Sequence, residues 1–122
     1  MSKIRPNREH PNPEAWQVWL AYVHFEGNDG GKERPVLVIE TNGSSCAIAE
    51  ITSKPPVSES DIQVTDLHSA GLGRASVIRA GNIRKISRPY LSSFIGTLSD
   101  CDRDAMKELI GNFSIAGKTN SH

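Results

Sequence analysis

The sequence predicts a mainly β domain with a single C-terminal helix. Ten glycines and seven prolines are spread over 122 residues, and such frequent chain breakers favour short strands over long helices. Short apolar segments alternate with these breakers, whereas helical periodicity is convincing only near the C-terminus. A chain of this length fits one domain that can bury a core without disulfides or metal. We therefore expect a small SH3-like barrel, that is, a strongly curved antiparallel sheet covered by a helix.

The N-terminal half contains the clearest strand signals. Residues 1–15 are polar and proline-rich, which predicts a flexible arm before the domain. Residues 16–25 form the first predicted strand, whose two faces are both apolar, so it is either central to a small barrel or presents one face to a partner. Residues 34–40 form the second strand, with Pro35 near its start because proline cannot donate to a sheet. The Asn-Gly pair at 42–43 predicts a hairpin into a return strand.

Shorter strands and one helix are expected in the remainder of the chain. The helix begins at Ser99, which forms a capping-box pattern with Asp102, and apolar residues then recur at helical spacing. Gly111 marks its predicted end, which leaves residues 114–122 as a tail and residues 16–113 as the domain. The other predicted strands span 46–52, 62–65, 75–80 and 83–86, residues 90–97 are either strand or irregular, and turns are expected at 68–73 and 81–82.

Composition excludes several classes of protein. Lys and Arg together number 14, as do Asp and Glu, so the formal net charge is zero and any nucleic-acid site must be a local patch. The longest apolar run, residues 18–23, is too short to span a membrane, and no signal segment opens the chain. Cys46 and Cys101 lie far apart and match no metal spacing. We therefore expect a cytoplasmic protein with reduced cysteines, no metal site and no cofactor.

A stretch without acidic side chains is the main candidate for binding a polyanion. No Asp or Glu lies between Asp66 and Asp100, although this stretch holds several basic residues. Arginine grips phosphate oxygens in pairs, and a strip of arginines beside the Ser76 hydroxyl can track a nucleic-acid backbone. The alternative is that these cations only keep a half-exposed sheet soluble. The basic residues are Arg74, Arg79, Arg84, Lys85 and Arg88.

Two more groups of polar side chains occur at predicted strand ends. Arg34 opens an apolar strand, where an arginine is costly unless it is paired or used for binding. Thr52, Ser53 and Lys54 close the return strand, and two hydroxyls with an ammonium can hold a phosphate. The alternatives are an edge arginine bonded to a loop carbonyl and ordinary turn capping by Thr and Ser.

Four blocks of the sequence resemble the PemK/MazF-like toxins of bacterial toxin–antitoxin pairs. In the first block a Trp-containing strand and a Gly/Asp-rich loop precede Arg-Pro-Val-Leu-Val-Ile, as in that family. The four blocks stand in the family's order and cover nearly all of residues 18–109. They are VWLAYVHFEGNDGGKERPVLVIE (18–40), AEITSKPP (49–56), AGLGRASVIRAGNIRKI (70–86) and IGTLSDCDRDAMKEL (95–109).

The resemblance implies the barrel with a terminal helix that these toxins share with gyrase-poisoning relatives. It also implies metal-independent cleavage of messenger RNA by a homodimer that a cognate antitoxin neutralises. By position, Arg34, Thr52 and Arg79 take the catalytic roles. PemK-type members carry an Asp shortly after the last of these, whereas this chain has Gly81 and no carboxylate there, so His24 or His68 is the alternative source of a general base.

The expected substrate is single-stranded RNA, because its 2′-OH can serve as the nucleophile. Two alternatives stay open: a non-catalytic barrel of the same fold that poisons gyrase, and a decayed toxin that acts as a binding or regulatory module. The residues expected to bind RNA are Ser53, Lys54, Arg74, Ser76 and Arg84.

Overall fold

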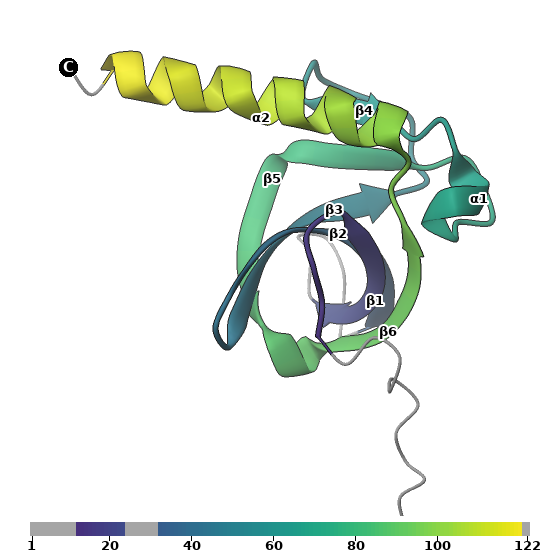
Figure 1. The fold of residues 1–122 in the computed structure, drawn as a ribbon. Helices are drawn as coiled ribbons and strands as arrows, with labels where there is room; N and C mark the ends of the chain where they lie inside the picture. The colour runs from purple at the N-terminus through teal and green to yellow at the C-terminus, as the bar shows by residue number, and fades with distance from the viewer. Residues whose placement is uncertain (1–11, 24–31, 121–122) are drawn as a thin grey trace, which may run out of the picture.

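A strongly curled antiparallel sheet forms the body of the protein (Figure 1). The computed structural model describes residues 12–23 and 32–120, with side chains for 12–23 and 33–111. Within this part of the chain six strands follow the order β4-β5-β3-β2-β1-β6, and helix α2 lies across the sheet, which confirms the predicted fold class. The elements are β1 (Gln17–Val23), β2 (Lys32–Asn42), β3 (Ser45–Thr52), β4 (Asp61–Gln63), α1 (Leu67–Ala70), β5 (Val77–Ser87), η2 (Arg88–Tyr90), β6 (Leu91–Thr97) and α2 (Asp100–Asn120).

Strand β1 has apolar side chains on both faces because each face packs into a different hydrophobic cluster. Val18 belongs to a cluster that also contains Met106 of α2. Trp19 belongs to a second cluster, built from strand residues inside the curl, where its ring meets Phe94 edge-on at 6.0 Å. Both faces of β1 are thus buried within one chain, apart from the half-exposed Tyr22. The apolar faces of this strand therefore do not by themselves require a partner.

The turn predicted at residues 81–82 lies instead inside one continuous strand, β5. The β3–β5 register shifts between Ala49 and Glu50, which leaves residues 80–82 without partners on β3. These residues form a bulge, and β5 bends sharply along its length (Figure 1). The glycine signal was correctly located, but it marks a bend within a strand and not a break between two strands.

Two other boundaries differ from the prediction. The segment 68–73 contains the end of a one-turn helix, α1, which Asp66 caps by accepting a hydrogen bond from the Ser69 N–H at 3.0 Å. Helix α2 continues through Gly111 to Asn120, so the predicted helix end is wrong and residues 114–120 are helical. A glycine inside a helix costs only about 0.5–1 kcal/mol relative to alanine, which weakens a helix without stopping it.

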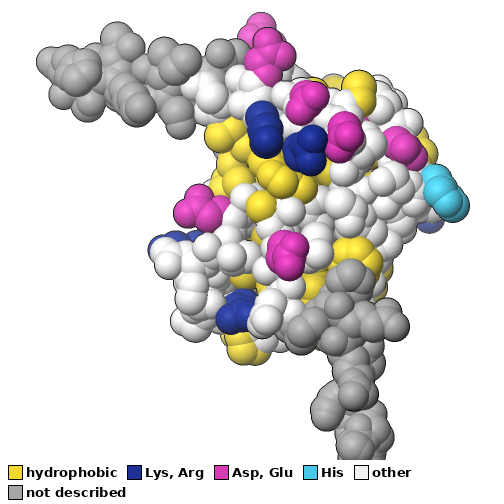
Figure 2. Space-filling view, in the orientation of Figure 1, with side chains coloured by type: hydrophobic (Ala, Val, Ile, Leu, Met, Phe, Trp, Pro, Cys, Tyr) yellow, Lys and Arg dark blue, Asp and Glu magenta, His cyan; other side chains and the backbone are white. Residues whose placement is uncertain are grey.

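The surface carries no broad field of one charge on the face shown in Figure 2. Acidic and basic side chains both occur on this face. No helix in the described part of the chain has the length and apolarity needed to cross a bilayer.

Both cysteines are free, and burial raises the pKa of the Cys46 thiol although Arg88 acts in the opposite direction.

Asp102, in the first turn of α2, joins that helix to the segment after β4. Its backbone N–H donates to the Ser99 hydroxyl at 3.2 Å, as the predicted cap requires. Its buried carboxylate accepts from the Thr65 hydroxyl at 2.8 Å and from the backbone N–H groups of Thr65 and Asp66. Burial alone would raise the pKa of this carboxyl, but these hydrogen bonds outweigh it and lower the pKa. The charged carboxylate is therefore part of the folded structure.

We expect Asp102 to make folding stability depend on acid pH. The pKa of Asp102 is lower in the folded state than in the unfolded state. The charged carboxylate therefore stabilises the fold at pH values above its unfolded-state pKa, and this stabilisation is lost as the pH falls through its folded-state pKa. Asp102→Asn should lower the free energy of unfolding at pH 7 by roughly 1.5–3 kcal/mol, the range for hydrogen bonds to charged groups. It should also flatten the decline in stability below about pH 4. Urea unfolding at pH 7 and pH 3 measures both effects, with the exposed Asp104→Asn as control. Equal pH dependence in Asp102→Asn and wild type would contradict this expectation.

Candidate active site

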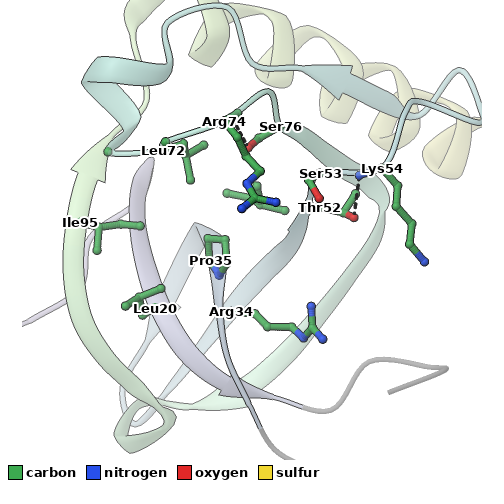
Figure 3. Close-up of a pocket in the computed structure, with 13 residues that line it drawn as sticks. Leu20, Arg34, Pro35, Thr52, Ser53, Lys54, Leu72, Arg74, Ser76 and Ile95 are labelled. Atoms are coloured by element: carbon green, nitrogen blue, oxygen red, sulfur yellow. Dashed lines mark hydrogen bonds between the residues drawn. The ribbon is translucent and has the colours of Figure 1, made fainter. Parts of the chain in front are cut away.

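One open cleft gathers most of the residues that the sequence predicts for the site (Figure 3). Its volume is about 410 Å³, and it lies where the ends of β2 and β3 meet β1, β6 and the loop after α1. The apolar and backbone parts of its wall come chiefly from Leu20, Leu72 and Ile95 and from Gly71 and Gly73. The predicted site residues that line it are Arg34, Thr52, Ser53, Lys54, Arg74 and Ser76.

Neighbouring strands bring Arg34 and Thr52 into the same cleft. Val36 of β2 pairs with Glu50 of β3, and Arg34 and Thr52 each lie two residues beyond this pair. Both side chains are partly exposed and lie on the same side of the cleft (Figure 3). Thr52 Oγ1 accepts a hydrogen bond from the Lys54 backbone N–H at 3.2 Å, and its own proton can be donated to a ligand.

The loop after α1 supplies a second cation to the cleft. The Arg74 side chain points toward the middle of the cleft (Figure 3). Ser76 is buried and its hydroxyl donates to the Arg74 carbonyl at 2.8 Å, so this serine shapes the loop that carries the arginine. The loop starts at Gly71, which has a φ of 75° and lies so close to β6 that a Cβ would meet the Ile95 carbonyl oxygen at 1.9 Å.

The two sides of the cleft differ in chemistry. Arg34, Arg74 and the Thr52 hydroxyl form a side that suits phosphate oxygens, because cations and hydroxyls both donate hydrogen bonds. Leu20 and Ile95 form part of an apolar side that suits the carbon surface of a ribose or base. Among the described residues that line this cleft there is no Asp, Glu or His. These described side chains can bind and polarise a phosphodiester, and none of them is a carboxylate or imidazole base.

Arg79, a predicted catalytic residue, does not line the cleft. It lies on β5 opposite Glu50, and the two side chains form a long ion pair with 3.9 Å between Arg79 Nη1 and Glu50 Oε1. Glu50 precedes Thr52 by two residues, so both side chains project from the same face of β3. The neighbouring strand thus places a carboxylate beside Arg79, although neither side chain is among the residues that line the cleft. Sequence reasoning missed Glu50, although its spacing of two from Thr52 was a usable signal.

The remaining candidates lie elsewhere. Arg84 lines a different cleft, together with Tyr22 and Tyr90. His68 is exposed on α1 and does not line the first cleft, and His24 lies outside the described residues. Within the described part of the chain no three His, Cys, Asp or Glu side chains gather as a metal site requires.

Fold and cleft together define a small β protein that can hold one phosphodiester at the ends of its strands. Residues 14–113 match the family model of the PemK-like, MazF-like toxin of type II toxin-antitoxin systems. The chain therefore belongs to this family, whose members are known as endoribonucleases. Among curated protein sequences none matches the chain.

Solved structures of toxins share this fold. The Mycobacterium tuberculosis toxin MazF-mt6 is 25% identical over 79% of this chain and 93% of its own, with a TM-score of 0.64. MazF from Deinococcus radiodurans is 21% identical over 83% of this chain and 94% of its own, with a TM-score of 0.63. A mycobacterial endoribonuclease in complex with its cognate antitoxin is 14% identical over 83% of this chain and 93% of its own, with a TM-score of 0.66.

Proposed function

We propose that this protein is an endoribonuclease toxin that cleaves single-stranded RNA without a metal ion. The observation that carries the proposal is the meeting of Arg34, Thr52 and Arg74 in one solvent-accessible cleft beside an apolar wall. Membership of a toxin family known for endoribonucleases supports the same substrate class. The cleft is small and local, as expected for a protein with zero net charge.

The proposed reaction uses the nucleophile that RNA carries. The 2′-oxygen attacks the adjacent phosphorus and loses its proton to solvent, the bond to the 5′-oxygen breaks, and that oxygen takes up a proton. The products are a 2′,3′-cyclic phosphate and a 5′-OH. Arg34 and Arg74 stabilise the negative charge that grows on the non-bridging oxygens, and the Thr52 hydroxyl orients the phosphate. Arg34 acts as an electrostatic clamp and not as an acid, because guanidinium keeps its proton at neutral pH.

Arg79 acts at longer range in this proposal. Its guanidinium is held beside Glu50 on the face of the sheet that also carries Thr52. Its Nε is buried and makes no hydrogen bond with the described residues. We propose that Glu50 orients Arg79, which adds positive potential behind the phosphate. Glu50→Gln should then lower the cleavage rate less than loss of Arg34 does, and a rate equal to wild type would reject this role.

Incubation of the purified protein with a long single-stranded RNA tests the proposed activity. We expect cleavage that persists in excess EDTA and leaves 5′-OH and 2′,3′-cyclic phosphate ends, identified by mass spectrometry. An RNA with 2′-O-methyl groups should bind and stay intact, because the nucleophile is blocked. Fragments with a 3′-OH, or cleavage abolished by EDTA, would contradict the proposed chemistry. Intact RNA together with inhibited gyrase would favour the non-catalytic alternative.

We also propose that the working form is a homodimer in the cytoplasm and that a cognate antitoxin inhibits it. The family supports this proposal, since a solved mycobacterial relative is described in complex with its antitoxin. An antitoxin with acidic side chains would match the cations of the cleft. Sedimentation that shows only a 13.3 kDa species at micromolar concentration would contradict the dimer.

A further inference from the structure

A second open cleft, of about 440 Å³, lies where the end of β1 meets the end of β5 and η2. Two tyrosines line it, and both are large aromatic side chains left in contact with solvent. Tyr22 of β1 is 51% exposed and Tyr90 of η2 is 54% exposed. Within the described residues these are the only aromatic rings among the exposed large hydrophobic side chains. Packing in the core therefore does not explain them.

Two cationic side chains also line this second cleft. Arg84 and Lys85 of β5 lie next to the tyrosines, and among the described lining residues there is no Asp, Glu or His. Glu33, which pairs in register with Tyr22, is turned toward the Ser92 hydroxyl and accepts its hydrogen bond. Exposed aromatic rings beside cations form the combination that binds single-stranded nucleic acid, because bases stack on the rings and phosphates pair with the cations.

Strand β1 connects the two clefts. Leu20 lines the first cleft and Tyr22 lines the second, and the two side chains project from the same face because they are two residues apart. Their Cα atoms are therefore separated by about 6.8 Å along the strand. A single RNA strand held at Arg34 can continue over β1 without crossing to the other side of the sheet.

We propose that the second cleft is a binding subsite for a nucleotide of single-stranded RNA that flanks the scissile phosphate. A base stacks on Tyr22 or Tyr90, and a backbone phosphate contacts Arg84 or Lys85. This inference rests on the proposed function for its substrate class. The subsite is assigned to RNA because rings that can stack with bases lie beside cations that can pair with phosphates.

Equilibrium binding of uncleavable RNA tests this subsite in the full-length protein. The probes are 2′-O-methyl oligonucleotides of two lengths. The shorter has about 2 nucleotides, with one phosphodiester that cannot contact both clefts, and the longer has about 12, which lies within the range of common single-strand site sizes. The double variant Tyr22→Ala/Tyr90→Ala should bind the longer probe roughly 5- to 100-fold more weakly, as expected for the loss of base stacking. Its affinity for the shorter probe should change little. Tyr90→Phe keeps the ring and should retain binding. Arg84→Gln with Lys85→Gln should reduce the salt dependence of binding.

The outcomes separate this inference from the nuclease proposal. Weaker binding of the longer probe supports the subsite even when wild-type protein fails to cut RNA, a result that rejects only the nuclease activity. Unchanged binding of both probes by tyrosine variants with a wild-type melting curve overturns the subsite. If the tyrosine variants lose binding to an acidic peptide but bind RNA like the wild type, the RNA subsite is also overturned, because the cleft would then bind a protein partner. If the tyrosine variants do not fold, the Arg84→Gln/Lys85→Gln variant, in which both replaced residues are exposed, provides the test. In that case, RNA affinity and salt dependence equal to those of the wild type would overturn the subsite.

Discussion

Arg34→Ala is expected to lower the rate of RNA cleavage by roughly 10²- to 10³-fold, as the loss of one preorganised charge-stabilising group usually does. The guanidinium lines the same cleft as Thr52, and an arginine can donate two parallel hydrogen bonds to a phosphate. Those bonds strengthen as negative charge grows on the phosphorane, so kcat should fall more than the affinity for uncleaved RNA. Single-turnover cleavage and binding of 2′-O-methyl RNA measure the two quantities separately.

Two control variants make this result specific. Arg34→Lys keeps the charge but loses the planar fork, so it should recover only part of the activity. Lys107→Gln removes one positive charge from the exposed side of α2 and should leave cleavage unchanged. Near-normal cleavage by Arg34→Ala would remove Arg34 from the mechanism. An equal loss in Lys107→Gln would show that the effect reflects total charge and not the cleft.

Gly71→Ala is expected to produce the largest loss of stability, roughly 3–5 kcal/mol, at the upper end of single-substitution effects. The residue has a φ of 75°, which alanine adopts only with strain. The new Cβ would also lie 1.9 Å from the Ile95 carbonyl oxygen, a backbone atom that cannot rotate away. Relief of this overlap must move the loop away from β6, and with it Arg74. Urea unfolding and RNA cleavage should therefore both report the change.

Gly73→Ala is the matched control, because it lies in the same loop and nothing would come within 4 Å of its Cβ. It should unfold within about 0.5 kcal/mol of wild type, as ordinary surface substitutions do. Gly96→Ala should behave like Gly71→Ala, since its Cβ would lie 2.3 Å from the Ala70 carbonyl carbon. Equal stability of Gly71→Ala and Gly73→Ala would show that the contact between this loop and β6 is not rigid.

Most elements of the fold could be predicted because their signals are local. The apolar run of β1, the Asn-Gly pair at 42–43 and the Ser99 cap each depend on residues close in the sequence. The prediction of a turn at 81–82 is wrong, since a glycine followed by asparagine is compatible with a turn and with a bulge within a strand. Only the pairing of β5 with β3 distinguishes these two outcomes.

The site was predicted in part for the same reason. Arg34 and the 52–54 segment stood out locally, at the ends of apolar strands, and the fold brings them together in one cleft. Arg84 and Arg74 are equivalent candidates in the sequence, yet the two line different clefts, since Arg74 lies in the loop after α1 and Arg84 lies in the second half of β5, beyond its bulge. The roles of these side chains in RNA cleavage stay predictions.

Amino-acid order alone establishes a small, curved β protein with one terminal helix, its toxin family and the residue types available for phosphate chemistry, since all of these follow from patterns within short segments. Folding in three dimensions establishes which of those residues share a cleft. It pairs Glu50 with Arg79, directs the Asp102 carboxylate to residues 65–66 and presses Gly71 against β6. The physical reason is that register, bends and close backbone contacts depend on residues far apart in the chain.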